Sequence, residues 1–130
     1  MVKEKCRILY VDDHEDSAEM LKLVLDADYE VETARTMEQA LQMAAQNPFD
    51  LYVFDKRLPD GSGLELVRRF NELTPHVPSV VYTGDAYEVH RQEALAAGAD
   101  AYVPKPDIEK LIETVHNFLA ERNCATAGSA

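Results

Sequence analysis

The stretch of sequence best suited to chemistry begins at an aspartate that follows a short apolar run. Residues 51–54 are Leu-Tyr-Val-Phe, which reads as a buried strand, and Asp55 follows directly. A carboxylate at the end of a buried strand is costly unless another group compensates its charge. Pro59 and two glycines in residues 56–63 then turn the chain, and Ser62–Glu65 has the spacing of a helix-capping box. Because ligands bind beyond the carboxyl ends of strands in open α/β sheets, Asp55 is the first candidate for chemistry.

Polar side chains also stand at the ends of three other predicted strands. Asp12 and Asp13 follow the first strand, Thr83 ends the fourth, and Lys105 lies just beyond the fifth. In a parallel sheet these ends share one edge, which would gather three carboxylates, one hydroxyl and one ammonium group. Two unit charges about 5 Å apart repel by roughly 3 kcal/mol at an effective dielectric constant of 20, so the carboxylates need a cation. Oxygen ligands without His or Cys favour a hard ion such as Mg²⁺.

This set of side chains is suited to phosphoryl transfer. A fixed lysine beside metal-bound carboxylates neutralises developing charge, and an aspartate can be the nucleophile that forms an aspartyl phosphate. Taken singly, each residue has an ordinary explanation, such as a helix-start acid for Asp12–Asp13 or an exposed turn at Lys105. Their joint occurrence at four strand ends of one small chain makes coincidence a poor explanation.

Five predicted strands alternate with five predicted helices. The strands are expected at residues 6–11, 29–33, 51–54, 79–83 and 101–103. The helices are expected at residues 14–25, 36–46, 62–70, 85–97 and 107–119, with caps at Thr36, Ser62, Asp85 and Asp107 and a left-handed end at Gly98. Strict alternation of this kind predicts right-handed crossovers, and therefore an α/β fold with a parallel sheet and helices on both faces.

Length, charge and composition restrict the class of protein. The 130 residues, 46% of them hydrophobic, suit one domain, and a net charge of −11 argues against direct binding of nucleic acid. No run approaches the ~20 apolar residues of a membrane span, so we expect no membrane association and a cytoplasmic location. Cys6 and Cys124 lie at opposite ends of the chain and are expected to be reduced thiols without a structural role.

Four motifs together resemble those of response-regulator receiver domains of the two-component, phosphorelay and chemotaxis type. They are Asp12-Asp13, the Asp-x-x-Leu-Pro-Asp-Gly of residues 55–61, Thr83-Gly84, and the Tyr-x-Pro-Lys-Pro of residues 102–106. The resemblance covers residues 6 to about 120. It implies a single-domain flavodoxin-like (βα)5 fold with sheet order 2-1-3-4-5. Residues 1–5 would then be a lead-in, 6–122 the receiver domain, and 123–130 a flexible tail.

The resemblance also implies a function and a role for each site residue. The chain would be a phosphoacceptor signalling switch and not an enzyme, since it would catalyse only its own phosphorylation and autodephosphorylation. Asp55 would accept a phosphoryl group from a histidine kinase or a histidine phosphotransfer protein. Asp12, Asp13, Asp55 and the backbone carbonyl of Arg57 would hold Mg²⁺, with Mn²⁺ as an alternative. Lys105 would pair with Asp55, and the peptide bond that follows Lys105 is typically cis in this family.

Thr83 and Tyr102 match the switch pair of the family. The Thr83 hydroxyl would bind the phosphoryl group and Tyr102 would move inward, which would alter the face made by the fourth helix, fifth strand and fifth helix for a downstream protein target not yet known. The side chains of Arg57 and Asp85 match positions that tune hydrolysis of the phosphoaspartate. A phosphorylation-dependent homodimer is left open.

Several neighbouring residues are expected to have no chemical role. Gly84 stands where the family commonly has alanine, and a small residue there leaves access to the phosphoryl group. Lys56 could point away from the site or lie near a partner, and is expected to be solvated. His14 is a candidate metal ligand or phosphodonor beside the acidic pair, but is expected to be a surface residue near the kinase-docking face, because oxygen ligands already suffice. The other histidines are also expected at the surface: His76, His90 and His116.

Two other classes of protein share parts of this pattern. A Mg²⁺-dependent phosphatase of the haloacid-dehalogenase kind also uses an aspartate nucleophile and a lysine. That class needs a second acid two residues after the nucleophile, where this chain has Arg57, and a cap domain for which 130 residues leave no room. A flavin-binding module is disfavoured because the loop after the first strand is acidic where a flavin phosphate would lie.

Overall fold

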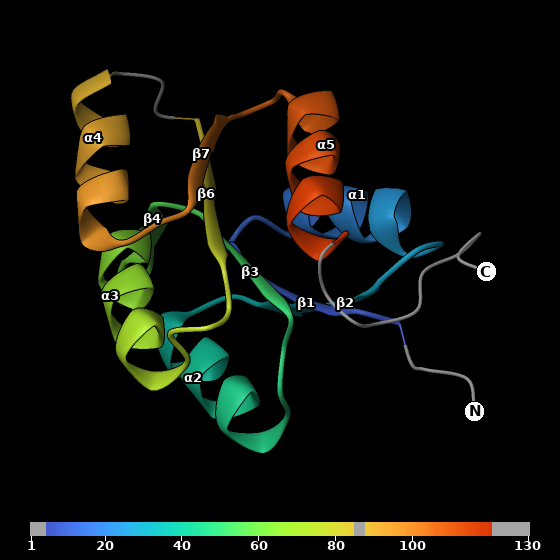
Figure 1. The fold of residues 1–130 in the computed structure, drawn as a ribbon, viewed down its shortest axis with the longest axis horizontal. Coiled ribbons are helices and arrows are strands. Elements are labelled where there is room, and N and C mark those ends of the chain that lie inside the picture. The colour runs from blue at the N-terminus through green and yellow to red at the C-terminus, as the bar shows by residue number, and fades with distance from the viewer. Residues whose placement is uncertain (1–4, 85–87, 121–130) are drawn as a thin grey trace.

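A five-stranded parallel sheet forms the centre of the molecule (Figure 1). The computed structural model describes residues 5–84 and 88–120. The sheet order is β2-β1-β3-β6-β7. Its strands are β1 (Arg7–Val11), β2 (Glu30–Ala34), β3 (Leu51–Phe54), β6 (Ser79–Thr83) and β7 (Ala101–Pro104). Taken as the first to fifth strands of the sheet, they confirm the expected order 2-1-3-4-5 and the flavodoxin-like α/β fold.

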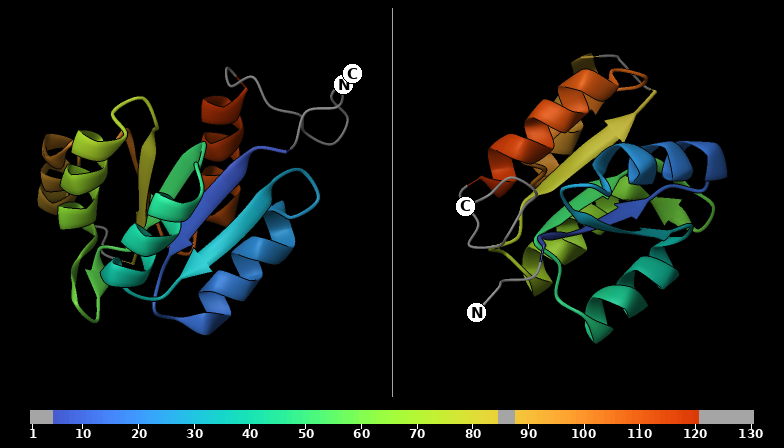
Figure 2. Two further views of the ribbon diagram at one scale, coloured as in Figure 1. Left: turned by 90° about the horizontal axis from the view of Figure 1, so that it is seen from below. Right: turned by 90° about the vertical axis from the view of Figure 1, so that its right-hand side faces the viewer.

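Five helices cover the two faces of this sheet (Figures 1 and 2). They are α1 (Glu15–Leu25), α2 (Met37–Gln46), α3 (Gly63–Leu73), α4 (Glu88–Ala97) and α5 (Ile108–Leu119). Helices α1 and α5 pack on one face, and α2, α3 and α4 pack on the other. Within the described ranges, none of the helices has the length and apolar character needed to cross a membrane.

Side-chain alternation along β1 assigns its residues to the two core layers. Leu9 and Val11 belong to the core beneath α2, α3 and α4, whereas Ile8 and Tyr10 belong to the core beneath α1 and α5. Every residue of the central strand β3 is buried, as a strand covered on both faces requires. Residues two positions apart in β1 therefore point to the same face of the sheet. Tyr10 and Asp12, at the end of the strand, are such a pair.

The turn predicted after Asp55 contains a small hairpin that the sequence did not indicate. Strands β4 (Arg57–Leu58) and β5 (Gly61–Ser62) pair antiparallel in a separate two-stranded sheet. Helix α3 begins at Gly63, whose backbone N–H donates to the carbonyl of Lys56 at 2.7 Å. A Cβ atom on Gly63 would lie 2.0 Å from the carbonyl oxygen of Asp55. A glycine is therefore required for the start of α3 to approach the backbone beside the candidate site.

The predicted helix ends are confirmed with changes in detail. Thr36 caps α2 by accepting from the N–H of Gln39, but the Gln39 side chain accepts from Arg35 and does not complete a capping box. Ser62 accepts from the N–H of Leu64, one residue earlier than the box predicts. Asp107 caps α5 through the N–H of Lys110, and Gly98 has a positive φ of 115°. The cap predicted at Asp85 lies outside the described residues.

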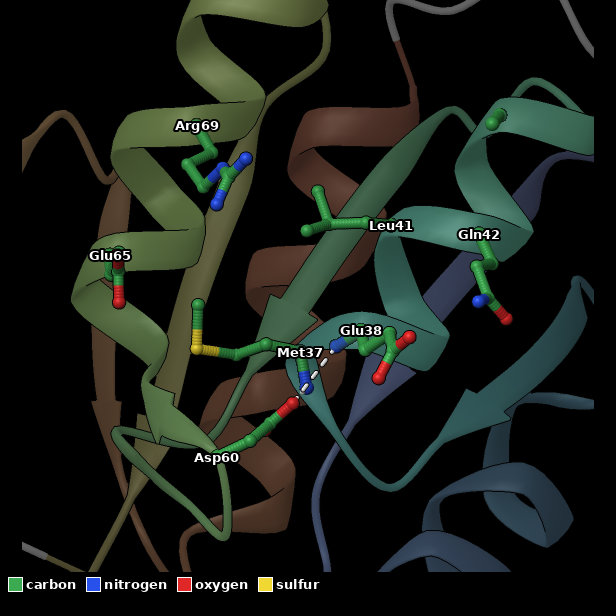
Figure 3. Close-up of a pocket in the computed structure, with 8 residues that line it drawn as sticks. Met37, Glu38, Leu41, Gln42, Asp60, Glu65 and Arg69 are labelled. Atoms are coloured by element: carbon green, nitrogen blue, oxygen red, sulfur yellow. Dashed lines mark hydrogen bonds between the residues drawn. The ribbon is translucent and has the colours of Figure 1, made fainter.

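Asp60 ties the loop that follows Asp55 to the first turn of α2 (Figure 3). Its carboxylate accepts from the backbone N–H groups of Met37 at 2.8 Å and Glu38 at 3.1 Å. The bond from Met37 lowers the pKa of Asp60, burial opposes this effect, and the bond from Glu38 lowers the pKa further. Two of the N–H groups that a helix start leaves unpaired are thus satisfied by a residue 22 or more positions away.

The expectation for Cys6 is wrong. Cys6 is fully buried and forms a disulfide bond. The chain has one other cysteine, Cys124, which lies outside the described residues. The expectation relied on separation along the sequence, but Leu119 at the end of α5 belongs to the same core cluster as Cys6. The fold therefore brings the last helix beside the first strand, and sequence separation is a poor guide to spatial distance.

Gly63→Ala should destabilise the protein even though alanine favours helices. Overpacking against the Asp55 carbonyl should lower the free energy of unfolding by about 1–3 kcal/mol, which exceeds the gain of about 1 kcal/mol expected from helix propensity. Gly84→Ala is the matched control, since a Cβ there meets no atom within 4 Å. Urea unfolding monitored by circular dichroism measures both variants. Equal stability of the two would contradict the close approach at Gly63.

Asp60→Ala should lower the free energy of unfolding by about 1 kcal/mol at pH 7, because two N–H groups of α2 lose their acceptor. The pKa of Asp60 is lower in the folded protein than in the unfolded chain. The stabilisation is therefore present at neutral pH and lost as the pH falls through that lowered pKa. Urea unfolding at pH 7 and near pH 3 tests this, with the exposed Glu113→Ala as control. A difference from wild type that is independent of pH would exclude the charged cap.

Candidate functional site

The hydrogen-bond ladder of the sheet extends one residue past three strands and positions the site. The N–H of Asp12 donates to Ala34 of β2 at 3.0 Å, and the N–H of Asp55 donates to Val11 of β1 at 2.9 Å. The N–H of Lys105 donates to the carbonyl of Thr83 at 2.8 Å. Each backbone is thus held by a neighbouring strand at the point where its side chain leaves the sheet.

Lys105 joins two buried carboxylates. Its Nζ lies 2.6 Å from Oδ2 of Asp12 and 3.1 Å from Oδ2 of Asp55, whose residues are 1% and 5% exposed. Burial lowers the pKa of Lys105, but the bond to Asp12 and the charge of Asp55 outweigh it and raise the pKa overall. The predicted pair between Lys105 and Asp55 is present, and the shorter contact is with Asp12.

Asp12 is held by donors on both of its oxygens. Oδ2 accepts from Lys105 and from the hydroxyl of Tyr10 at 2.5 Å, and Oδ1 accepts from the backbone N–H of His14 at 3.0 Å. Burial alone would raise the pKa of Asp12, but these hydrogen bonds lower it to about 2. Burial, and then the bond to Asp12, raises the pKa of Tyr10 well above its usual value, so the hydroxyl remains a donor. Asp12 is therefore an oriented, ionised carboxylate.

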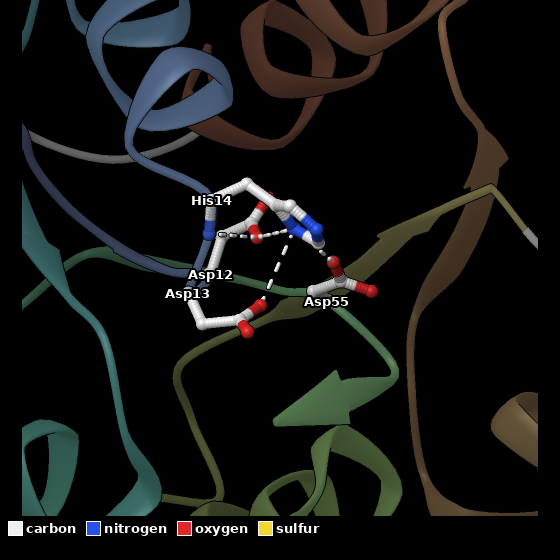
Figure 4. Close-up of side chains that lie close together, drawn as sticks. All are labelled: Asp12, Asp13, His14 and Asp55. Carbon is white, nitrogen blue, oxygen red and sulfur yellow. Dashed lines mark hydrogen bonds and ion pairs between the residues drawn. The ribbon is translucent and has the colours of Figure 1, made fainter. Parts of the chain in front are cut away.

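The imidazole of His14 lies among the three carboxylates (Figure 4). Its Nδ1 is 2.9 Å from Oδ1 of Asp12, 3.3 Å from Oδ1 of Asp13 and 3.9 Å from Oδ2 of Asp55. The hydrogen bond to Asp12, followed by the charges of Asp12 and Asp13, raises the pKa of His14. His14 is exposed, as expected of a surface residue, and its ring also contacts the carboxylates of the site, as the ligand alternative requires.

The acidic cluster is compatible with a divalent cation. One ligand atom from each of Asp12, Asp13, His14 and Asp55 can be chosen so that all lie within 4.8 Å of one another. Oδ1 of Asp13 is buried without a hydrogen-bond partner in the described part of the chain. Three carboxylates and Lys105 leave two uncompensated negative charges when His14 is neutral. A hard cation with oxygen ligands would satisfy both the orphaned oxygen and this charge.

The remaining predicted site residues differ in their burial and in their distance from the acidic cluster. Thr83 is 4% exposed at the end of β6, and Gly84 after it is exposed. Tyr102 on β7 is half-buried, packs against the core beneath α4, and lines a surface pocket between α4, β7 and α5. Arg57 is exposed, and its N–H donates to Oδ1 of Asp55 at 3.4 Å. Asp85 lies outside the described residues.

The backbone at Lys105 also matches the expectation. The peptide bond between Lys105 and Pro106 is cis. Taken together, the contacts described above show which predicted residues meet at one edge of the sheet: Asp12, Asp13, Asp55, Thr83 and Lys105. Tyr102 instead faces the pocket beside α4.

Lys56, expected to be solvated, is partly buried and has a contact, and the exposed His116 has one as well. The Nζ of Lys56 contacts Nδ1 of His90 on α4, so the residue after Asp55 reaches across to this helix. His116 contacts the hydroxyl of Tyr29. Sequence reasoning also missed Tyr10. The signal was available, because a tyrosine two positions before Asp12 shares its face of β1.

This arrangement defines the class of a phosphoacceptor domain, and comparisons with known proteins agree. A family model described as response regulator receiver domain matches residues 8–116. The chain belongs to the response regulator receiver domain family and is a phosphoacceptor signalling switch of two-component systems. Members of this family interact with histidine kinases and downstream effectors.

Relatives of known sequence or structure resemble this chain over most of its length. The response regulator protein PilR of Pseudomonas aeruginosa is 37% identical over 119 residues, which cover 90% of this chain and 27% of PilR. A CheY-like receiver domain protein of Methanospirillum hungatei is 36% identical, with a TM-score of 0.84 over 91% of this chain and 96% of that one. The chain spans between 9% and 27% of the first three curated relatives that it matches.

Tyr10→Phe should destabilise the protein more than Tyr52→Phe. The Tyr10 hydroxyl donates to a carboxylate, and hydrogen bonds to charged groups contribute about 1.5–3 kcal/mol. The Tyr52 hydroxyl shares a neutral bond with Thr74 at 2.9 Å, for which about 0.5–1.5 kcal/mol is expected. Both tyrosines are buried, and each substitution removes one hydroxyl. Urea unfolding at pH 7 compares them, and equal losses would show that the charge of Asp12 does not strengthen the bond from Tyr10.

Proposed function

We propose that Asp55 is the phosphoacceptor of this receiver domain. The supporting observation is its carboxylate, which is 5% exposed at the end of β3, 3.1 Å from the ammonium group of Lys105 and beside Asp12 and Asp13. An oxygen of Asp55 attacks the phosphorus of a phosphohistidine. The P–N bond of the donor breaks, its electron pair returns to the imidazole, and a P–O bond forms on Asp55.

Asp12, Asp13, Asp55 and the carbonyl of Arg57 are proposed to hold Mg²⁺, with Mn²⁺ as an alternative. When bound, the ion neutralises charge on the phosphoryl oxygens. Asp13 is the best-placed carboxylate for this role, because its Oδ1 has no hydrogen-bond partner in the described residues. Asp12 has one oxygen occupied by Tyr10 and Lys105, so it contributes through Oδ1.

Lys105 is proposed to hold a phosphoryl oxygen after transfer. At rest it compensates the charges of Asp12 and Asp55. A phosphoryl group on Asp55 adds negative charge and acceptor oxygens at the same place, so Lys105 can keep Asp12 and exchange Asp55 for a phosphoryl oxygen.

Thr83 and Tyr102 are proposed to transmit this change to the surface. The Thr83 hydroxyl would donate to the phosphoryl group from the end of β6. A charge-assisted bond contributes about 1.5–3 kcal/mol, which shifts a two-state equilibrium by about one to two orders of magnitude. Tyr102 lines the pocket between α4, β7 and α5, so its movement alters the face offered to a downstream protein.

A histidine kinase or a phosphotransfer protein is the proposed donor. Helix α1 starts directly after the acidic pair and exposes Met20, Leu23 and Val24, which are 58%, 81% and 42% accessible. An exposed apolar stripe on the helix that starts at the site suits contact with a helix of the donor. We further propose that the chain catalyses only its own phosphorylation and dephosphorylation, with the exposed side chain of Arg57 and that of Asp85 setting the rate of hydrolysis.

Incubation with Mg²⁺ and a small acyl phosphate should add one phosphoryl group to the intact protein. The group should be absent in Asp55→Asn, which keeps the shape of the acceptor but lacks the nucleophilic carboxylate. Asp60→Asn, in the same loop but outside the acidic cluster, is the control and should be modified like wild type. Intact-protein mass spectrometry measures all three. Modification of Asp55→Asn to the wild-type level would assign the acceptor elsewhere.

A further inference from the structure

We propose that His14 is a nitrogen ligand of the acidic metal site and makes the site select borderline ions such as Ni²⁺ over Mg²⁺. The proposal rests on the metal site described above and adds to its oxygen ligands a fourth side chain from the start of α1. It concerns which ion the site prefers, not whether Asp55 is phosphorylated.

The position of Nδ1 of His14 matches that of a ligand sharing one ion with the carboxylates. Around an octahedral ion with bonds of about 2.1 Å, neighbouring ligand atoms lie about 3.0 Å apart and opposite ones about 4.2 Å apart. Nδ1 is 2.9, 3.3 and 3.9 Å from oxygens of Asp12, Asp13 and Asp55. These separations need only small adjustments for all four atoms to reach a common centre.

The Nδ1 atom of His14 shares a hydrogen bond with Oδ1 of Asp12 at 2.9 Å, and an ion held by both atoms would replace this bond. His14 occupies the N-cap position of α1, yet its side chain makes no capping hydrogen bond. Its backbone is held, because its N–H donates to Oδ1 of Asp12 at 3.0 Å. The residue is therefore anchored at its backbone, and its side chain is 67% exposed, which leaves room for the ring to adjust toward an ion.

The donors around Asp12 leave room for a nitrogen ligand. Tyr10 and Lys105 occupy Oδ2 of Asp12, so this carboxylate offers an ion only Oδ1 and cannot chelate it with both oxygens. Asp13 supplies the Oδ1 that lacks a hydrogen bond in the described residues, and Asp55 lies at the end of the neighbouring strand β3. A mixed set of one nitrogen and several oxygens results.

Such a mixed set changes the preference among ions. Carboxylate and carbonyl oxygens suit Mg²⁺, whereas imidazole suits Ni²⁺, Cu²⁺ and Zn²⁺. Removal of the imidazole should therefore weaken Ni²⁺ binding far more than Mg²⁺ binding. A histidine that acted only as a counter-charge would not discriminate in this way.

Isothermal titration calorimetry of the unphosphorylated full chain with NiCl₂ and with MgCl₂ tests the proposal. In His14→Ala the affinity for Ni²⁺ should fall at least about tenfold, while the affinity for Mg²⁺ changes less than about threefold. His76→Ala is the matched control, because His76 is exposed and lies before the first residue of β6, at the other end of the strands. It should leave the ratio of the two affinities unchanged.

Asp13→Asn separates this proposal from the proposed metal site itself. Loss of both ions in Asp13→Asn, with a selective loss of Ni²⁺ in His14→Ala, supports both. If Asp13→Asn loses both ions but His14→Ala changes both affinities equally or neither, the site stands and the role of His14 is overturned. If Asp13→Asn still binds both ions as wild type does, the metal site is wrongly placed and the ligand role of His14 is overturned with it.

Discussion

The compensation of buried carboxylates by Lys105 is the interaction on which the rest of this structure depends. The lysine bridges Asp12 and Asp55, which lie 93 and 50 positions before it in the chain. Two such carboxylates at the carboxyl edge of a covered sheet would repel each other and lose hydration without it. The bridge forms only when β1, β3 and β7 run parallel in one sheet, because each strand delivers one of the three side chains. The order and direction of the strands thus determine the geometry of the site.

The compensation is incomplete, which leaves surplus negative charge at the site. Asp12 is satisfied by Tyr10, Lys105 and His14, whereas Asp13 keeps a buried oxygen without a hydrogen bond in the described residues. A site with surplus negative charge around one bridging ammonium group is sensitive to an added cation or phosphoryl group. The sheet backbone around it is rigidly paired, so the response falls on side chains and on the helices beside them.

Much of the fold was predictable because local rules and the global fold agree. The strands before Asp12, Asp55 and Thr83 are short apolar runs, and alternation with helices dictates a parallel sheet. The antiparallel hairpin around Pro59 was not predictable, because two pairs of residues carry no strand signal. The disulfide at Cys6 was missed because sequence separation does not show which segments meet in space, and Cys6 shares a core cluster with Leu119 at the end of α5.

The sequence by itself determined which side chains could act: the acidic pair, Asp55, Thr83 and Lys105, since residue type and position at a strand end follow from the chain alone. Only the tertiary structure decided how they share their charges. It placed Lys105 closer to Asp12 than to Asp55, put the Tyr10 hydroxyl on the same carboxylate, and set the His14 ring among three acids. These outcomes depend on differences of a few tenths of an ångström in the distances between side chains. Periodicity and motif spacing carry no information at that scale.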